Sequence, residues 1–208
     1  NKTVKLPLTD RVFDVIQYRV LKNNDIMMLA RLKQEDKRRR GPEVFDYSIL
    51  HYNLELKKIT EYPMEVTKYE PQNAIFGVNE KDNWVDIIGF MARRNKSEYV
   101  GMYHERLDLE TKEWEPIDRK TTYHSFERIE ERDFRSLHLY ERYDQVYNYK
   151  LRDIVYLSTG DPVFISEHVN VWKDSIVDPQ TKEVTYNYYY KYNDILTAKI
   201  DRENKFEW

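Results

Sequence analysis

Alternating apolar and polar positions run through most of the chain, and this alternation predicts strands rather than helices. Together with runs of β-branched and aromatic residues, it predicts strands over 11–21, 26–32, 44–56, 84–92, 98–107, 153–157, 163–172 and 184–200. Short polar stretches separate these ranges, as in β-hairpins, and a longer loop is expected over 173–183. The pattern therefore predicts a single all-β domain of antiparallel hairpins over 1–208.

Three of the predicted hairpin ends resemble one another. In each, an apolar or aromatic residue precedes Asn53, Asp108 or Asp201, and a charged turn with Lys leads to a large apolar residue. The spacing from Asn53 to Asp108 is close to the roughly 40–50 residues of known propeller blades. The longer spacing from Asp108 to Asp201 fits one blade plus an insertion. We place that insertion at 126–144, where apolar residues fit helical spacing and strand alternation equally well.

These repeats predict a β-propeller or part of one. A closed propeller has typically 4–8 blades, and three or four fit in 208 residues, so we expect a partial propeller, such as a fragment of a six-bladed one. The alternative is that ordinary β-turn chemistry produced similar hairpin ends without a repeated architecture.

A row of tyrosines is the most distinctive constellation in the sequence. Tyr186, Tyr188, Tyr190 and Tyr192 share one face of a strand at period 2, and Trp172 lies on the other arm of the same hairpin. Such a row suits stacking on sugar rings or anchoring a protein partner. The alternative is cross-strand packing within a buried sheet. Both interpretations remain open at the level of sequence.

Composition narrows the choice of partners. The 34 basic and 37 acidic residues nearly cancel, so no long-range field attracts nucleic acid, and we expect no nucleic-acid partner. The absence of cysteine excludes disulfides and thiolate sites. No apolar run approaches the roughly 20 residues of a membrane helix, so no transmembrane segment is expected. The first residues lack signal-peptide features, and we expect that a signal has been removed.

The sequence contains no motif that predicts catalysis or a cofactor. Glycine-rich phosphate loops and the nucleophile elbow of hydrolases are missing. No metal site is predicted, because no helical metal spacing occurs among His51, His104, His124, His138 and His168. Carboxylate pairs such as Asp108 with Glu110, and the basic run 37–40, are best explained as solvated turns and loops. We therefore expect a protein that is not an enzyme and binds no cofactor.

The C-terminal segment 151–208 resembles an uncharacterised family of Bacteroidota envelope proteins thought to form β-propellers. The resemblance rests on a Tyr-rich strand followed by NDI, KID and a Trp, here Asp161, Glu167, the tyrosines from Tyr186 to Tyr192, Asn193, Asp194, Ile195, Lys199, Ile200, Asp201 and Trp208. Pro162 departs from the family's simple turn, and the chain stops where such proteins continue. The resemblance implies export to the periplasm, outer membrane or cell surface, with the cytoplasm left open, and no known chemistry.

Three functions follow as hypotheses. The first is a non-catalytic binding or scaffold protein of the bacterial cell envelope, acting through contacts with a protein partner. The second is a glycan-binding protein that uses the tyrosine row. The third is a propeller hydrolase with carboxylates in a central channel.

Overall fold

The computed structural model describes residues 13–33, 45–55, 57–64, 69–93, 99–115, 123–125, 149–201 and 205–207. Within these ranges the chain is all-β, with antiparallel pairing throughout and no helix. The first sheet has the order β1-β2-β3-β4, made of Phe13–Val20, Ile26–Lys33, Phe45–Tyr52 and Lys58–Pro63. The expected all-β class is confirmed.

Two further sheets follow in chain order. The second has the order β5-β6-β7-β8, made of Tyr69–Asn79, Trp84–Arg93, Tyr99–Asp108 and Glu113–Trp114, and β9 (Tyr123–Ser125) pairs with β7. The third has the order β10-β11-β12-β13, made of Tyr149–Tyr156, Pro162–Val177, Val184–Ile200 and Phe206–Glu207. In each sheet, four strands therefore pair in the order in which the chain makes them, and the second sheet has β9 as a fifth strand.

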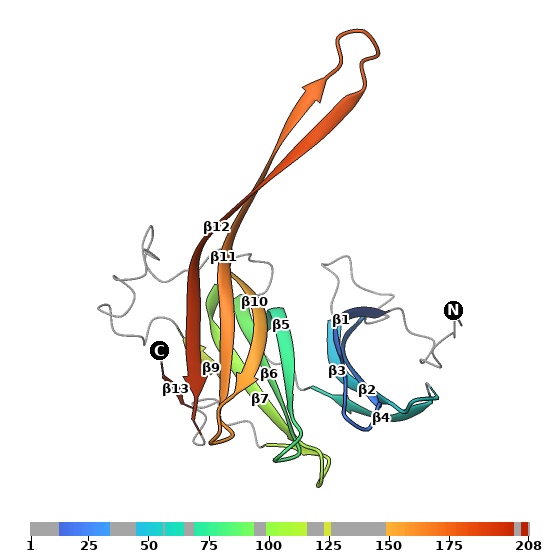
Figure 1. The fold of residues 1–208 in the computed structure, drawn as a ribbon, viewed down its shortest axis with the longest axis vertical. Coiled ribbons are helices and arrows are strands. Elements are labelled where there is room, and N and C mark those ends of the chain that lie inside the picture. The colour runs from blue at the N-terminus through green and yellow to red at the C-terminus, as the bar shows by residue number, and fades with distance from the viewer. Residues whose placement is uncertain are drawn as a thin grey trace.

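The second sheet lies between the other two and is buried on both faces (Figure 1). The core between the first and second sheets is formed by Met27, Leu29, Tyr47, Ile49, Tyr62, Met64, Ala74, Phe76, Val85, Ile87, Met91, Tyr103 and Leu107. The core between the second and third sheets is formed by Ile75, Ile88, Phe90, Met102, Tyr149, Leu151, Ile154, Phe164, Leu196, Ala198 and Ile200. Burial on both faces explains why β6 is an almost continuous apolar run.

The first strands of the three sheets are tied together by polar side chains. Gln17 on β1 accepts a hydrogen bond from the backbone N–H of Phe76 on β5 (2.7 Å). Arg19 donates through Nε to the carbonyl of Phe76 (3.0 Å), and its guanidinium also pairs with Asp153 on β10. One arginine thus connects all three sheets through β1, β5 and β10.

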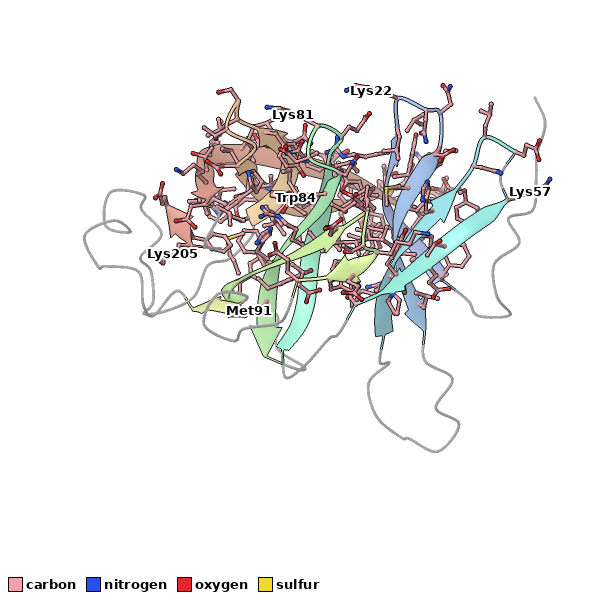
Figure 2. The ribbon with its side chains drawn as sticks, turned by 90° about the horizontal axis from the view of Figure 1, so that it is seen from below. Lys22, Lys57, Lys81, Trp84, Met91 and Lys205 are labelled. Atoms are coloured by element: carbon pink, nitrogen blue, oxygen red, sulfur yellow. The ribbon has the colours of Figure 1, made fainter. Side chains whose placement is uncertain are left out.

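Turns that the sequence identified as similar hold equivalent places. Asn53, Asp108 and Asp201 each begin the turn between the third and fourth strands of a sheet. Their side-chain oxygens accept backbone hydrogen bonds within the turn: Asn53 Oδ1 from Glu55 (3.1 Å) and Lys57 (2.9 Å), Asp108 Oδ1 from Glu110 (2.7 Å) and Thr111 (3.1 Å), and Asp201 Oδ1 from Lys205 (2.8 Å). The turns between the first and second strands also hold equivalent places in the three sheets, and Figure 2 labels Lys22 and Lys81 in two of them. The repeat of hairpin ends is confirmed.

The structure also corrects several predicted boundaries. The expected loop over 173–183 is wrong, because β11 continues to Val177 and only 178–183 form the turn. The strand β5 was not predicted from the pattern. The predicted insertion 126–144 lies outside the described residues. Part of the extra spacing before Asp201 comes instead from β11 and β12, which have 16 and 17 residues against 8 to 10 in the matching strands of the other sheets.

The three sheets do not close into a ring within the described ranges. Nor does any helix in these ranges have the length and hydropathy needed to cross a membrane.

Candidate binding ribbon

The outer halves of β11 and β12 leave the third sheet as a two-stranded ribbon. We use "the ribbon" for residues 169–192, in which Val169 pairs with Tyr192 at the base and Val177 pairs with Val184 at the tip. Figure 1 shows it extending far from the three sheets and twisting along its length. Strong twist is typical of two-stranded ribbons, because no third strand flattens them.

Local sequence explains why this hairpin forms. Its strands are rich in Val, Ile, Thr and Tyr, which favour extended backbone. At the tip, Asp178 Oδ1 accepts hydrogen bonds from the backbone N–H groups of Gln180 (2.7 Å) and Thr181 (3.0 Å). The bond from Thr181 is the largest cause, and that from Gln180 the next, by which the pKa of Asp178 is held below its ordinary value. Lys182 takes a positive φ of 61°, which closes the turn.

One face of the ribbon carries the predicted tyrosine row. Tyr186, Tyr188, Tyr190 and Tyr192 lie opposite Ser175, Lys173, Val171 and Val169 of β11. Lys173 Nζ lies 4.8 Å from the centre of the Tyr186 ring, a cation–π contact that runs diagonally between the strands. The period-2 arrangement predicted from the sequence is therefore present, and its rings are arranged along one strand.

Trp172 does not belong to that row. It pairs with Tyr189, so both residues occupy the opposite face of the ribbon. The two rings stack with centroids 5.7 Å apart and planes 13° from parallel. Trp172 lies on the other arm of the hairpin, as predicted, and the register places it on the face opposite the Tyr186–Tyr192 row. The ribbon thus carries aromatic rings on both faces.

Beyond its base, where Val169 is buried, both faces of the ribbon are exposed to solvent. The exposed fractions are 48% for Trp172, 49% for Tyr186, 57% for Tyr188, 41% for Tyr189, 58% for Tyr190 and 56% for Tyr192. Core residues of the third sheet, such as Phe164, are 0% exposed. Packing of the tyrosine row inside a buried sheet is therefore wrong for this structure. Contiguous exposed apolar surface of this kind is typical of interaction sites.

Among the residues that the structure describes, no third strand pairs with the ribbon. β10 pairs with β11 only as far out as His168, and β13 pairs with β12 only at Lys199 and Ile200. Within the described residues, each ribbon strand therefore has a partner on one side alone. An isolated two-stranded hairpin is only marginally stable in water, and a free edge can accept another strand.

At its base the ribbon meets charged side chains of the third sheet. Arg152 on β10 pairs with Glu167 on β11 (Nη2–Oε2, 2.9 Å). The guanidinium carbon of Arg152 also lies 6.0 Å from the centre of the Tyr192 ring. Tyr192 therefore has a charged neighbour that belongs to the sheet. The tyrosines farther out on the ribbon extend beyond β10.

A second polar constellation, which was not predicted from the sequence, is buried between the second and third sheets. Asp86 Oδ1 lies 2.8 Å from His104 Nε2 and 2.7 Å from Arg106 Nε, and the side chains of Asp86 and His104 are 0% exposed. Arg106 also lies over the Trp84 ring, 4.4 Å from its centre, and Figure 2 labels Trp84. Burial alone would raise the pKa of Asp86, but His104 and Arg106 hold it below its ordinary value.

Tyr156 on β10 adds a residue from the neighbouring sheet to this cluster. Burial, with the nearby Asp86 carboxylate, raises the pKa of Tyr156 well above its ordinary value. A Cβ at Gly77 would lie 2.8 Å from the Tyr156 hydroxyl oxygen, so only glycine leaves room for it. The acidic and imidazole side chains of this cluster are buried, and Tyr156 brings a residue of the third sheet next to them.

Several other candidate residues from the sequence make contacts that explain their positions in the fold. His168 stacks on Tyr149 with ring centroids 5.1 Å apart, and His51 Nε2 lies 2.9 Å from Asp25 Oδ2. Asp108 caps its turn. The basic run 37–40, His124 and His138 lie in parts of the chain whose side chains are not described. Among the described residues, no group of three or more His, Asp or Glu could hold a metal ion.

Comparison with known proteins gives no relative. No family model matches this chain, and neither does any curated protein or solved structure.

Proposed function

We propose that the three sheets are consecutive blades of a β-propeller architecture. Each sheet contains a four-stranded meander, and the capped turns at Asn53, Asp108 and Asp201 repeat at equivalent places. The sheets stack face to face in chain order. Their first strands lie beside one another, as the innermost strands of blades do, and Arg19 bridges all three.

We further propose that the chain is a non-catalytic binding or scaffold protein and that the ribbon is its contact element. The observation that carries this proposal is the ribbon itself, which presents five tyrosines and Trp172 to solvent beyond any core. Tyrosine and tryptophan dominate the energetics of protein interfaces, because they bury large areas at a small entropic cost. A protein partner would cover both faces of the ribbon and pair with an open edge.

The bacterial cell envelope is the location we propose for this activity. The support is the resemblance of the C-terminal segment to the Bacteroidota envelope family, which includes the tyrosines of the ribbon strand. A partner anchored in the periplasm, the outer membrane or the cell surface fits that setting.

Replacement of two tyrosines tests the role of the ribbon. Tyr188→Thr with Tyr190→Thr removes two exposed rings and keeps residues that favour strands. The wild-type chain, immobilised and exposed to an extract of the source cells, is expected to retain a partner that the double variant loses. Tyr18→Thr is the matched control, since Tyr18 is 66% exposed on β1, away from the ribbon. Equal retention by all three proteins would refute the proposal.

A glycan ligand is the second candidate. The flat faces and hydroxyl rims of the tyrosine row could stack on sugar rings, and the exposure of Tyr188 and Tyr190 favours this use. Binding of wild type to a glycan array, lost in the same double variant and kept in Tyr18→Thr, would support it. Glycan binding that survives the loss of both tyrosines would remove it.

A further inference from the structure

The ribbon strand β12 reads nearly the same in both directions. Residues 186–192 are Tyr, Asn, Tyr, Tyr, Tyr, Lys and Tyr, with Tyr189 at the centre. In an antiparallel pair of strands the chain directions oppose each other, so a palindromic strand is complementary to a second copy of itself. A pairing centred on Tyr189 also keeps each residue on its own face, as two-fold symmetry requires.

On the tyrosine face, this register places aromatic residues opposite each other. Tyr188 lies opposite Tyr190 of the second copy, and Tyr186 lies opposite Tyr192 of the second copy, each pair occurring twice by symmetry. Aromatic cross-strand pairs are among the favourable pairs in sheets. The four tyrosines of each copy would then form one continuous aromatic surface across the pair.

On the opposite face, the register avoids a clash of charges. Tyr189 meets its own copy and extends the stack with Trp172 into a row across four strands. Asn187 lies opposite Lys191 of the second copy, where its amide oxygen can accept from the ammonium group. The two lysines therefore do not face each other, which matters because like charges directly opposite are destabilising.

The edge that this pairing needs has no strand beside it within the described part of the chain, and its sequence offers little protection. The outer edge of β12 from Val184 to Tyr192 contains no proline and only one lysine. Natural proteins usually guard such an edge with proline, charges or a bulge. The outer edge of β11 carries Lys173 and Asp174, so β12 is the less protected of the two.

We propose that the partner of the ribbon is a second copy of this chain, joined by antiparallel pairing of β12 with β12 about Tyr189. The two ribbons then form a four-stranded sheet between two propeller-like bodies. This inference rests on the proposed function of the ribbon as a protein-binding element, and it names the partner and the register.

A charge exchange tests the pairing by sedimentation velocity. Asn187→Lys places lysine opposite Lys191 of the second copy twice, and it is expected to weaken the dimer about tenfold. Within its own ribbon the new lysine lies opposite Asp174, so loss of the dimer cannot be attributed to a weaker ribbon. Adding Lys191→Glu is expected to restore the dimer. A dimer indifferent to these changes would overturn the proposal.

Disulfide formation tests the register, and the chain offers a clean background because it has no cysteine. Tyr189→Cys is expected to cross-link with itself on mild oxidation. Tyr188→Cys is expected to cross-link efficiently only when mixed with Tyr190→Cys, since these two positions are opposite each other between copies. Equal cross-linking of Tyr188→Cys alone and in the mixture would contradict the register.

The tests also separate this proposal from the proposed function beneath it. If wild type sediments as a monomer at every concentration, the self-pairing is wrong. In that case, if a partner from the cell extract is lost with Tyr188→Thr and Tyr190→Thr, the binding function of the ribbon still stands. If the monomeric chain retains nothing through these tyrosines, both proposals fail.

Discussion

At the scale of single residues, the buried carboxylate of Asp86 is the most consequential charge in the described structure. Its oxygen Oδ1 meets both His104 and Arg106 with no exposure to water. Taking charges out of water is costly, and the cost is offset only while the partners remain together. The integrity of the contact between the second and third sheets therefore depends on this group.

Replacing Asp86 by Asn is expected to lower the free energy of unfolding at pH 7 by about 3 kcal/mol, because the buried Arg106 would lose its close counter-charge and keep only the more exposed Glu115, 3.9 Å away. Asp86 has a lowered pKa in the folded protein, so its contribution is present above the unfolded pKa of about 4 and is lost as the pH falls through the folded value. The difference in free energy of unfolding between wild type and Asp86→Asn should therefore become smaller below about pH 4. Urea unfolding at a series of pH values measures this, with exposed Asp174→Asn as control. A constant difference down to pH 2 would contradict it.

The identity of this cluster could not be predicted from the sequence. Asp86 is one of 37 acidic residues, and nothing in the sequence around it marks it as buried while the others are exposed. It is buried only because sheets cover both faces of β6, and that depends on contacts between residues far apart in the chain. The orientation of His104 away from Glu105 did follow from strand alternation, since they pair with Ile88 and Ile87 on opposite faces.

At the scale of elements, the sequence predicted most strands and misplaced one loop. The sequence predicts the strand 184–200 with the boundaries that β12 has, because the segment is rich in β-branched and aromatic residues throughout its length. The sequence pattern predicts a loop at 173–177 because both faces of the ribbon are exposed to water, so no contrast between apolar and polar faces marks the strand. Alternation correctly placed four tyrosines on one face, whereas the face of Trp172 required the register with β12.

The exposure of the ribbon predicts that its tyrosines contribute little to folding of the monomer. Tyr188→Thr with Tyr190→Thr is expected to change the free energy of unfolding by less than about 1 kcal/mol, since surface substitutions act weakly. Phe164→Ala removes a side chain that is 0% exposed and should cost about 3–5 kcal/mol. Urea unfolding at low protein concentration compares the two variants. A large loss from the tyrosine variant would mean that the ribbon packs against a core.

At the scale of the whole molecule, three meanders stack in chain order, and the ribbon emerges from the last of them (Figure 1). The body supplies rigidity through its buried cores, while the ribbon holds the aromatic surface away from it. Sequence repeats predicted the equivalence of the sheets, because turn chemistry is local. The projection of the ribbon could not be predicted, since it depends on where β10 and β13 stop pairing.

Arg19 is the residue whose loss should separate the first sheet from the other two. Arg19→Met removes its bond to the Phe76 carbonyl and its pair with Asp153, and it keeps most of the aliphatic length. Because the Arg19 side chain is partly exposed, we expect the free energy of unfolding to fall by only about 1–2 kcal/mol. The effect should be local, so hydrogen exchange should accelerate at the amides of β1 and remain slow in β6, which is buried on both faces. Asp14→Asn, which breaks an exposed pair with Arg31 on the same sheet, is the control and should leave exchange in β1 nearly unchanged. Uniform acceleration in all three sheets of Arg19→Met would mean that they unfold as one unit and that this arginine does not join separable blades.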